Sequence, residues 1–255
     1  MTLSDVADVL EWSPAKLGHI ETGIRKWPSV MEVSALLRLY GVTGGQREAI
    51  LTMVRESRLR PWWTEYEDVL SSAYVGNEAG AIAIDTYAGI LVPDLLQTPE
   101  YTAALARAQG RDAATVERMV AAFLKRQEVL ERDNLERYHA VIEEDALRRV
   151  AADSELLHRQ LRRLIEVAED EDNPITVQLM PTSSGLHAAT SGPFTVLEFD
   201  EGESSLAFVD AAHGGAIVEA DDAVAKCVEV WHRLTDVALP QQSTLVMLKR
   251  LDLLT

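Results

Sequence analysis

Residues 3–23 carry a helical pattern with sharp boundaries, which leaves little choice of fold for the start of the chain. Ser13 followed by Pro14 is a helix N-cap with proline at the first helical position, and Gly23 is a left-handed stop. The apolar face repeats at helical spacing and consists of Val6, Ala7, Leu10, Leu17 and Ile20. Two short helices with this spacing are typical of a bacterial helix-turn-helix.

The second of these helices predicts how the segment would meet DNA. Ala15, Lys16 and His19 point away from the apolar face and are the candidates for contacts with base edges. Arg25 and Lys26, with the helix N-terminus, are the candidates for phosphate contacts. The alternative is a short helical hairpin with ordinary caps, because the exposed face is poor in Arg, Asn and Gln, which suit bidentate base contacts best.

The charge of the chain is distributed unevenly. The net charge is −17, yet residues 1–60 hold eight Lys and Arg against seven Asp and Glu, so the first segment is close to +1 and the remainder close to −18. A strongly acidic surface repels a phosphate backbone. Any DNA binding is therefore expected in the first segment alone.

Several classes of protein are disfavoured by the composition. The single cysteine, Cys227, excludes an internal disulfide framework and a multi-cysteine zinc site. No apolar run approaches the roughly 18 residues that span a bilayer, and the N-terminus does not resemble a signal peptide. These features predict a soluble cytoplasmic protein without a membrane partner.

We predict an α+β protein with two domains. Residues 1–60 form a small all-helical head, a truncated helix-turn-helix DNA-binding domain whose first helix is missing, so that its apolar face is expected to be partly uncovered. Residues 61–255 form a helical domain with a mostly antiparallel sheet. Helices are predicted near 77–91, from Pro99, and at 114–134, 153–169 and 221–238, and strands at 138–142, 175–180, 194–199, 206–209 and 216–219.

The segment from Trp12 to Lys16 together with Ile20–Gly23 resembles the Xre-type helix-turn-helix of the actinobacterial WhiJ-like regulators. The similarity extends over nearly the whole chain and includes Trp62-Trp63, Leu91–Thr98 with Tyr101, His139–Glu144 with Ala146–Arg149, Gln160-Leu161, Thr176–Pro181 and Gly192–Phe199. It implies a DNA-binding regulator of development or secondary metabolism that acts with a small partner protein encoded nearby, in an antitoxin-like arrangement. The C-terminal domain of that family has no assigned biochemical role.

The sequence departs from the family in its missing first helix and at two further places. Gly18-His19 stands where the family usually has Ser-Arg, which removes a strong contact to DNA. Asp94 stands where glycine is usual, which is unfavourable for a tight turn at that point.

A catalytic constellation is weakly supported. Ser183, Ser184 and His187 with Asp210 and His213 could be assembled into a Ser/His/Asp set on paper, but polar residues at strand ends are common without chemistry. His139 and Glu143 share a strand face without a third metal ligand, and Cys227 lies at helical spacing among apolar residues. We therefore expect no catalytic residues, no metal and no cofactor, and favour a protein that is not an enzyme.

Two loops of the second domain predict a binding site. Residues 181–193 are rich in Pro, Ser, Thr and Gly and carry His187, and residues 210–215 carry His213. Long loops in a compact domain are often functional, although a plain surface loop is the simpler alternative. A ligand or an extended partner segment is expected near the site residues Trp62, Trp63, Tyr66, His187 and His213.

The leading interpretation is a transcriptional regulator that binds DNA, with an affinity that the sequence leaves open, and that senses a small molecule or a protein partner. The sequence is also compatible with a homodimer. One alternative is a regulator scaffold with a decayed DNA-binding head that acts as an enzyme or small-molecule-binding protein in a biosynthetic pathway. Another is a purely protein-binding, antitoxin-like module. The operator, the ligand and the partner do not follow from the sequence.

Overall fold

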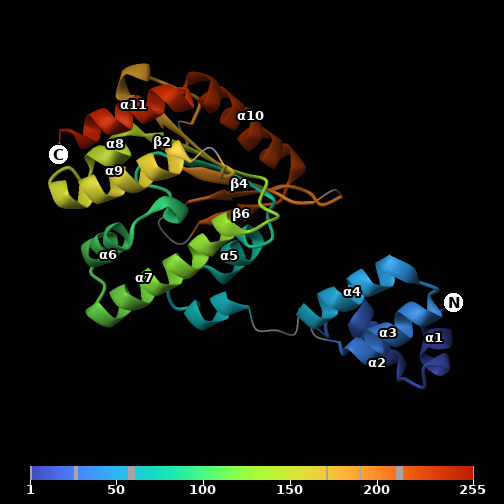
Figure 1. Ribbon diagram of the computed structural model, residues 1–255. Helices are drawn as coiled ribbons and strands as arrows, with labels where there is room; N and C mark the ends of the chain where they lie inside the picture. The colour runs from blue at the N-terminus through green and yellow to red at the C-terminus, as the bar shows by residue number, and fades with distance from the viewer. Residues whose placement is uncertain are drawn as a thin grey trace. The chain divides into compact units, whose positions relative to one another are not determined.

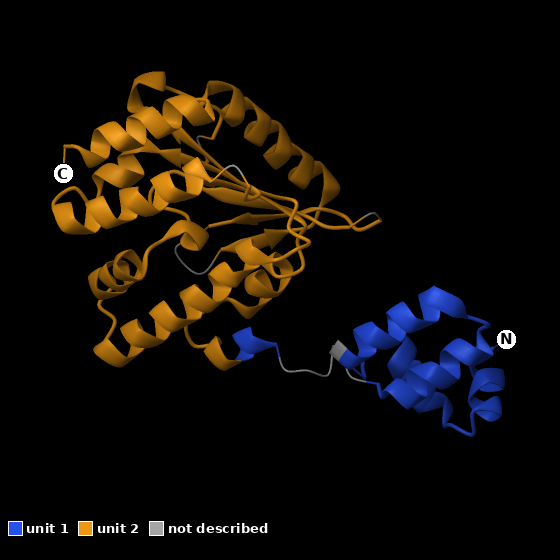
Figure 2. Cartoon of the chain, in the orientation of Figure 1, with its two compact units in different colours: residues 1–64 blue, residues 65–255 orange. Residues whose placement is uncertain are grey.

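The structure is a computed structural model that describes residues 2–25, 28–56, 61–170, 172–189, 191–200, 202–210 and 215–254. The chain divides into two compact units, residues 1–64 and residues 65–255 (Figure 2). Within the described residues, no helix is long and apolar enough to cross a membrane.

Unit 1 is helical throughout its described part, with α1 (Leu3–Val9), α2 (Pro14–Glu21), α3 (Val30–Leu39) and α4 (Gly44–Glu56). Side-chain caps start the first three helices, because Thr2, Ser13 and Ser29 each accept a backbone N–H three residues ahead. Gly23 has a φ of +72° and ends α2 as predicted.

The core of unit 1 joins α1, α2 and α3. Val6 and Leu17 are buried, with 2 % and 0 % exposed, and they pack with Ala7 and Leu36. The expected loss of cover on this apolar face is therefore wrong for Val6 and Leu17, because α3 supplies Leu36 against them. Val9, the last residue of α1, is 60 % exposed.

The turn between α1 and α2 contains backbone strain that the sequence did not indicate. Glu11 has a φ of +54°, the left-handed region that glycine adopts at little cost. The backbone N–H of Glu11 donates to the carbonyl of Asp8, and that of Trp12 donates to Ala7. This tight turn allows α2 to begin at Pro14, three residues after Glu11, with Ser13 as its N-cap.

Unit 2 is built on a mixed six-stranded sheet with the order β3-β2-β1-β4-β5-β6, which confirms the predicted α+β class. Its described strands are β1 (Ala83–Ala88), β2 (Arg137–Glu143), β3 (Ile175–Met180), β4 (Phe194–Glu198), β5 (Leu206–Val209) and β6 (Ala216–Val218). Three of the five pairings between these strands are antiparallel, and the two among β1, β2 and β3 are parallel.

The register brings the two predicted loops to one end of the sheet. Phe194 at the start of β4 lies opposite Tyr87 near the end of β1, and Val209 at the end of β5 lies opposite Phe194. The carboxyl ends of the parallel strands β1, β2 and β3 share this end. The chain therefore leaves β3, enters β4 and leaves β5 at the same end.

Helices cover both faces of the sheet (Figure 1). On one face, Trp231 and Leu234 of α10 pack on Tyr87 and Val141. On the other lie α5 and α7, while α9 and α11 pack along β3, whose Leu179 N–H is bonded to the Thr244 hydroxyl. The helices of unit 2 are α5 (Ser72–Glu78), α6 (Pro99–Ala108), α7 (Ala113–Gln127), α8 (Glu144–Arg148), α9 (Ser154–Glu169), α10 (Asp221–Val237) and α11 (Gln241–Asp252).

The helix predicted over residues 77–91 is wrong. The chain forms α5 up to Glu78 and then the central strand β1, all six residues of which are buried. A strand buried on both faces lacks the alternation of apolar and polar residues that marks a half-exposed strand. The helix predicted at 114–134 also ends early, at Gln127, and continues as a 3-10 turn, η3 (Glu128–Glu131).

We predict that Glu11→Gly stabilises unit 1 by about 0.5–1 kcal/mol, since relief of a left-handed non-glycine residue exceeds the added entropy of the unfolded chain. The matched control is Asp8→Gly, which removes the same charge from the last turn of α1 and should cost up to about 0.5–1 kcal/mol. Thermal unfolding of both variants measures the difference. Equal destabilisation by the two variants would contradict strain at Glu11.

Candidate nucleic-acid interface and polar clusters of unit 2

Helix α2 has the build of a recognition helix. The Ser13 hydroxyl accepts the backbone N–H of Lys16 at 3.2 Å, and Pro14 occupies the first turn, where no N–H is needed. Leu17 is fully buried against α1 and α3, which fixes the rotation of the helix. Consequently Ala15 and His19 are exposed on the opposite side.

Two of the three cations predicted to contact DNA, Lys16 and Arg25, lie against Glu32 of α3. Lys16 Nζ lies 2.9 Å from Glu32 Oε1 and 4.1 Å from the centre of the Trp12 ring, and Arg25 Nη2 lies 3.1 Å from Glu32 Oε2. Burial opposes ionisation of Glu32, but hydrogen bonds from Lys16 and Ser29 outweigh it and lower its pKa to about 2. Lys26, the third predicted cation, lies outside the described residues.

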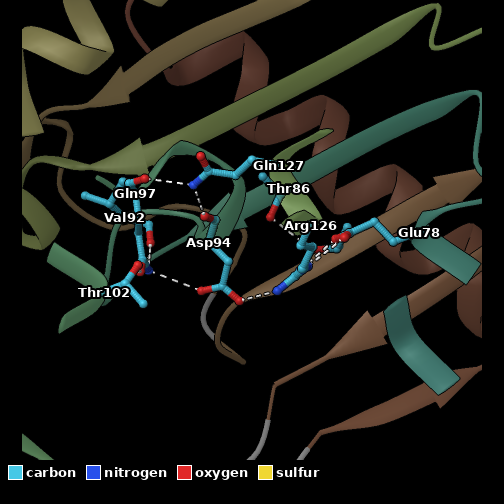
Figure 3. Close-up of polar contacts among 9 residues, drawn as sticks. Glu78, Thr86, Val92, Asp94, Gln97, Thr102, Arg126 and Gln127 are labelled. Carbon is cyan, nitrogen blue, oxygen red and sulfur yellow. Dashed lines mark hydrogen bonds and ion pairs between the residues drawn. The ribbon is translucent and has the colours of Figure 1, made fainter. Parts of the chain in front are cut away.

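A buried ion network in unit 2 was not predicted (Figure 3). Arg126 of α7 donates from Nε and Nη2 to the two carboxylate oxygens of Glu78 at 2.6 Å each, and from Nη1 to Asp94 Oδ2 at 2.7 Å. The side chains of Arg126 and Glu78 are 9 % and 2 % exposed. Such a fork-shaped pair ties α5 to α7 in the interior of the unit.

The same network shapes the loop after β1. Asp94 opens the 3-10 turn η2 (Asp94–Leu96), and its Oδ1 accepts a hydrogen bond from Gln97 at 3.1 Å. Gln127 of α7 donates to the Asp94 and Gln97 carbonyls at 3.2 and 2.8 Å. Asp94 does not take a left-handed backbone, so it does not need the conformation that glycine would permit.

Arg126 could have been found from the helical spacing. Val116, Met119 and Phe123 form the apolar face of α7, and Arg126 follows three residues later on that face. A charged residue on a buried face needs a partner of opposite charge. The partners, Glu78 and Asp94, lie 48 and 32 residues away, so sequence spacing did not indicate them.

A second cluster lies at the carboxyl ends of β1 and β2. The Tyr87 hydroxyl donates to Glu143 Oε1 at 3.0 Å, and His187 Nε2 lies 3.0 Å from the same oxygen. The backbone N–H of Ala189 donates to His187 Nδ1 at 3.3 Å, which leaves the ring proton on Nε2 to point at Glu143. Burial raises the pKa of Glu143, and burial with the neighbouring Glu143 carboxylate also raises that of Tyr87.

Within unit 2, the predicted site residues Tyr66 and His187 have different neighbours. Tyr66 lies against Arg118 of α7, 5.0 Å from ring centre to guanidinium, whereas His187 contacts Tyr87 and Glu143 on the face that α10 covers. Trp62 and Trp63 meet edge to face at 5.9 Å in the 3-10 turn η1 (Trp62–Tyr66), at the boundary between the units. His213 lies outside the described residues.

The other polar candidates, His139 and Cys227, have neighbours that are typical of a protein core. His139 Nε2 is 2.8 Å from Gln178 Oε1, its ring meets that of Trp231 at 4.9 Å, and burial lowers its pKa. Cys227 is half-buried against the same cluster, and burial raises its pKa. In the described ranges, no three His, Cys, Asp or Glu side chains are grouped as metal ligands.

Comparison with protein families agrees with this geometry. Residues 1–50 match a helix-turn-helix domain, a kind of domain that is typical of DNA-binding regulators. Residues 71–250 match a domain of unknown function, DUF5753. Because this match covers more than half of the chain, the protein is a member of the DUF5753 family. The comparisons with curated proteins and with solved structures give no match.

We predict that Arg126→Met destabilises unit 2 by about 3–5 kcal/mol, since it leaves the Glu78 carboxylate buried and unpaired. Arg126→Met with Glu78→Gln should recover part of this loss. The matched control is Arg118→Met, on the same helix but with an exposed partner, Asp68, and it should change little. Urea unfolding, with hydrogen exchange in β1 to assign the transition, measures all three. Equal losses for both arginines would contradict the role of the network.

We also predict opposite pH effects for two adjacent carboxylates. The raised pKa of Glu143 makes its contribution to stability largest below the unfolded value of 4.5 and lost as pH rises above it, so the stability of Glu143→Gln should increase relative to the wild type as pH rises above 4.5. The pKa of Glu144 is lowered, since bonds from Arg148 and Thr182 outweigh burial, so its contribution is present above 4.5 and lost as pH falls, and the stability of Glu144→Gln should increase relative to the wild type as pH falls below 4.5. Thermal unfolding against pH tests this, and parallel curves would refute it.

Proposed function

We propose that this protein is a transcriptional regulator that binds operator DNA through α2. The carrying observation is the arrangement around that helix, in which the Ser13 cap leaves the N-terminal turn open while Ala15 and His19 are exposed. Ala15, Lys16 and His19 are the proposed contacts with base edges. Arg25 and Lys26 are the proposed contacts with phosphates.

The charge distribution supports unit 1 as the only part that meets DNA. Residues 1–64 carry a net charge close to +1, whereas the rest of the chain carries close to −18. Phosphate contacts release counterions only where Lys and Arg face the backbone of DNA. Unit 2 is accordingly assigned a different role.

We infer that unit 2 senses a small molecule or an extended partner segment. In support, the chain leaves β3 and β5 at the same end of the sheet, and Tyr87, Glu143 and His187 meet there. In open sheets, the carboxyl ends of parallel strands are the usual place for ligands. Trp62, Trp63, Tyr66 and His213 stay in the proposal on the sequence argument alone.

The biological role is proposed from the resemblance to the WhiJ-like, Xre-type regulators. It would place the protein in an actinobacterial, antitoxin-like arrangement with a small partner protein, in development or secondary metabolism, with a homodimer on DNA. The second candidate is a small-molecule-binding protein or enzyme with a decayed DNA-binding head. The pairing of both Lys16 and Arg25 with Glu32 favours that candidate if it shields them from DNA.

The regulator proposal predicts that Arg25→Ala with Lys26→Ala weakens binding to the protein's own promoter at least tenfold. Each lost phosphate contact should also reduce the slope of log affinity against log salt by about 0.9. The control is Arg38→Ala, an exposed arginine in the last turn of α3, which should change affinity less than twofold. Gel shifts at several salt concentrations measure both quantities. Unchanged affinity and slope in the double variant would overturn the assignment.

A further inference from the structure

Lys16 and Arg25 reach one carboxylate from opposite ends of α2. Lys16 lies in the first turn of α2, and Arg25 lies four residues beyond its last residue, Glu21. Their side chains meet at Glu32, on Oε1 at 2.9 Å and on Oε2 at 3.1 Å. One acidic group of α3 thus holds both Lys16 and Arg25.

Glu32 is itself held in place. Its Oε2 accepts the backbone N–H of Ser29 at 2.7 Å, while the Ser29 hydroxyl accepts the Glu32 N–H at 3.1 Å, which is a complete capping box. The Glu32 side chain is 13 % exposed, and its core neighbour Leu36 anchors α3. The carboxylate therefore has little freedom to swing away when the surroundings change.

Both cations keep donors for another acceptor. The side chains of Lys16 and Arg25 are 32 % and 42 % exposed. An ammonium has three N–H donors and a guanidinium five, and Glu32 takes one from each in the closest contacts. Without the carboxylate, the positive charges of Lys16 and Arg25 would repel each other and move apart.

We propose that Glu32 is a positioning residue that holds Lys16 and Arg25 together as a two-cation clamp for a DNA phosphate. This inference rests on the proposed function and specifies how that interface works. The phosphate is bound by the remaining donors of the two side chains, which need no further ordering on binding. Lys16 thereby acts on the backbone of DNA, and Ala15 and His19 are left for the base edges.

Two effects of removing the carboxylate oppose each other. The loss of one negative charge near DNA favours binding, and this effect is only partly screened, because Glu32 lies about 3 Å from both cations, well within the Debye length of about 8 Å. The loss of the clamp frees two long side chains, each of which must be ordered again on binding. The inference requires the second effect to be the larger one, so that neutralising Glu32 weakens DNA binding.

The experiment compares Glu32→Gln with Asp5→Asn in the full-length chain. Glutamine suits the same position of a capping box, so the start of α3 is retained. Asp5 is the equivalent capping-box carboxylate of α1, where it is bonded to Thr2, and Asp5→Asn removes the same charge. Affinity for the protein's own promoter and its salt slope are measured at a temperature at which circular dichroism shows both variants folded.

The expected result is a roughly tenfold loss of affinity for Glu32→Gln with a salt slope smaller by about one phosphate contact, and less than a twofold change for Asp5→Asn. A gain in affinity for Glu32→Gln would show that Glu32 shields the cations and would overturn the inference. Equal behaviour of the two variants would reduce Glu32 to a helix cap. If the wild-type protein does not bind its promoter at all, the proposed function fails and this inference fails with it.

Discussion

The architecture of unit 2 depends on the burial of β1 in the middle of the sheet. This strand is hydrogen-bonded to β2 on one side and to β4 on the other, and all of its residues are buried. Each polar side chain on it therefore needs a partner. Asp85 is bonded to Arg137 at 3.0 and 2.9 Å, Thr86 to Thr195 at 2.9 Å and Tyr87 to Glu143 at 3.0 Å, so the partners come from both neighbouring strands.

The alternation of side chains along the strands places the two polar clusters on opposite faces of the sheet. Tyr87 and Glu143 reach the carboxyl end on the face covered by α10, where His187 meets them. The network of Arg126 lies on the opposite face, where Arg126 stacks on Tyr74 at 5.0 Å and Tyr74 packs on Phe208 of β5. One strand thus separates a cluster open to the loops from a buried ion network that holds α5, α7 and η2 together.

In unit 1, a single carboxylate next to α2 has two roles. Glu32 caps α3 and at the same time forms ion pairs with Lys16 of α2 and with Arg25, which follows α2. The positions of these two cations therefore depend on the packing of α3.

The sequence by itself determined the features that depend on neighbours along the chain. Contacts within about four residues determine the caps at Ser13, Ser29 and Thr98, the stop at Gly23 and the amphipathic helix α9. The existence of a helix-turn-helix follows from the same local pattern. Tertiary structure decided the rest. A strand that is buried on both faces has no alternation of apolar and polar residues, and for this reason the sequence pattern over β1 wrongly predicts a helix. The partners of Arg126, of Glu143 and of Lys16 lie between 16 and 56 residues away, and a charged side chain carries no local sign of the distant carboxylate, histidine or tyrosine that folding brings to it.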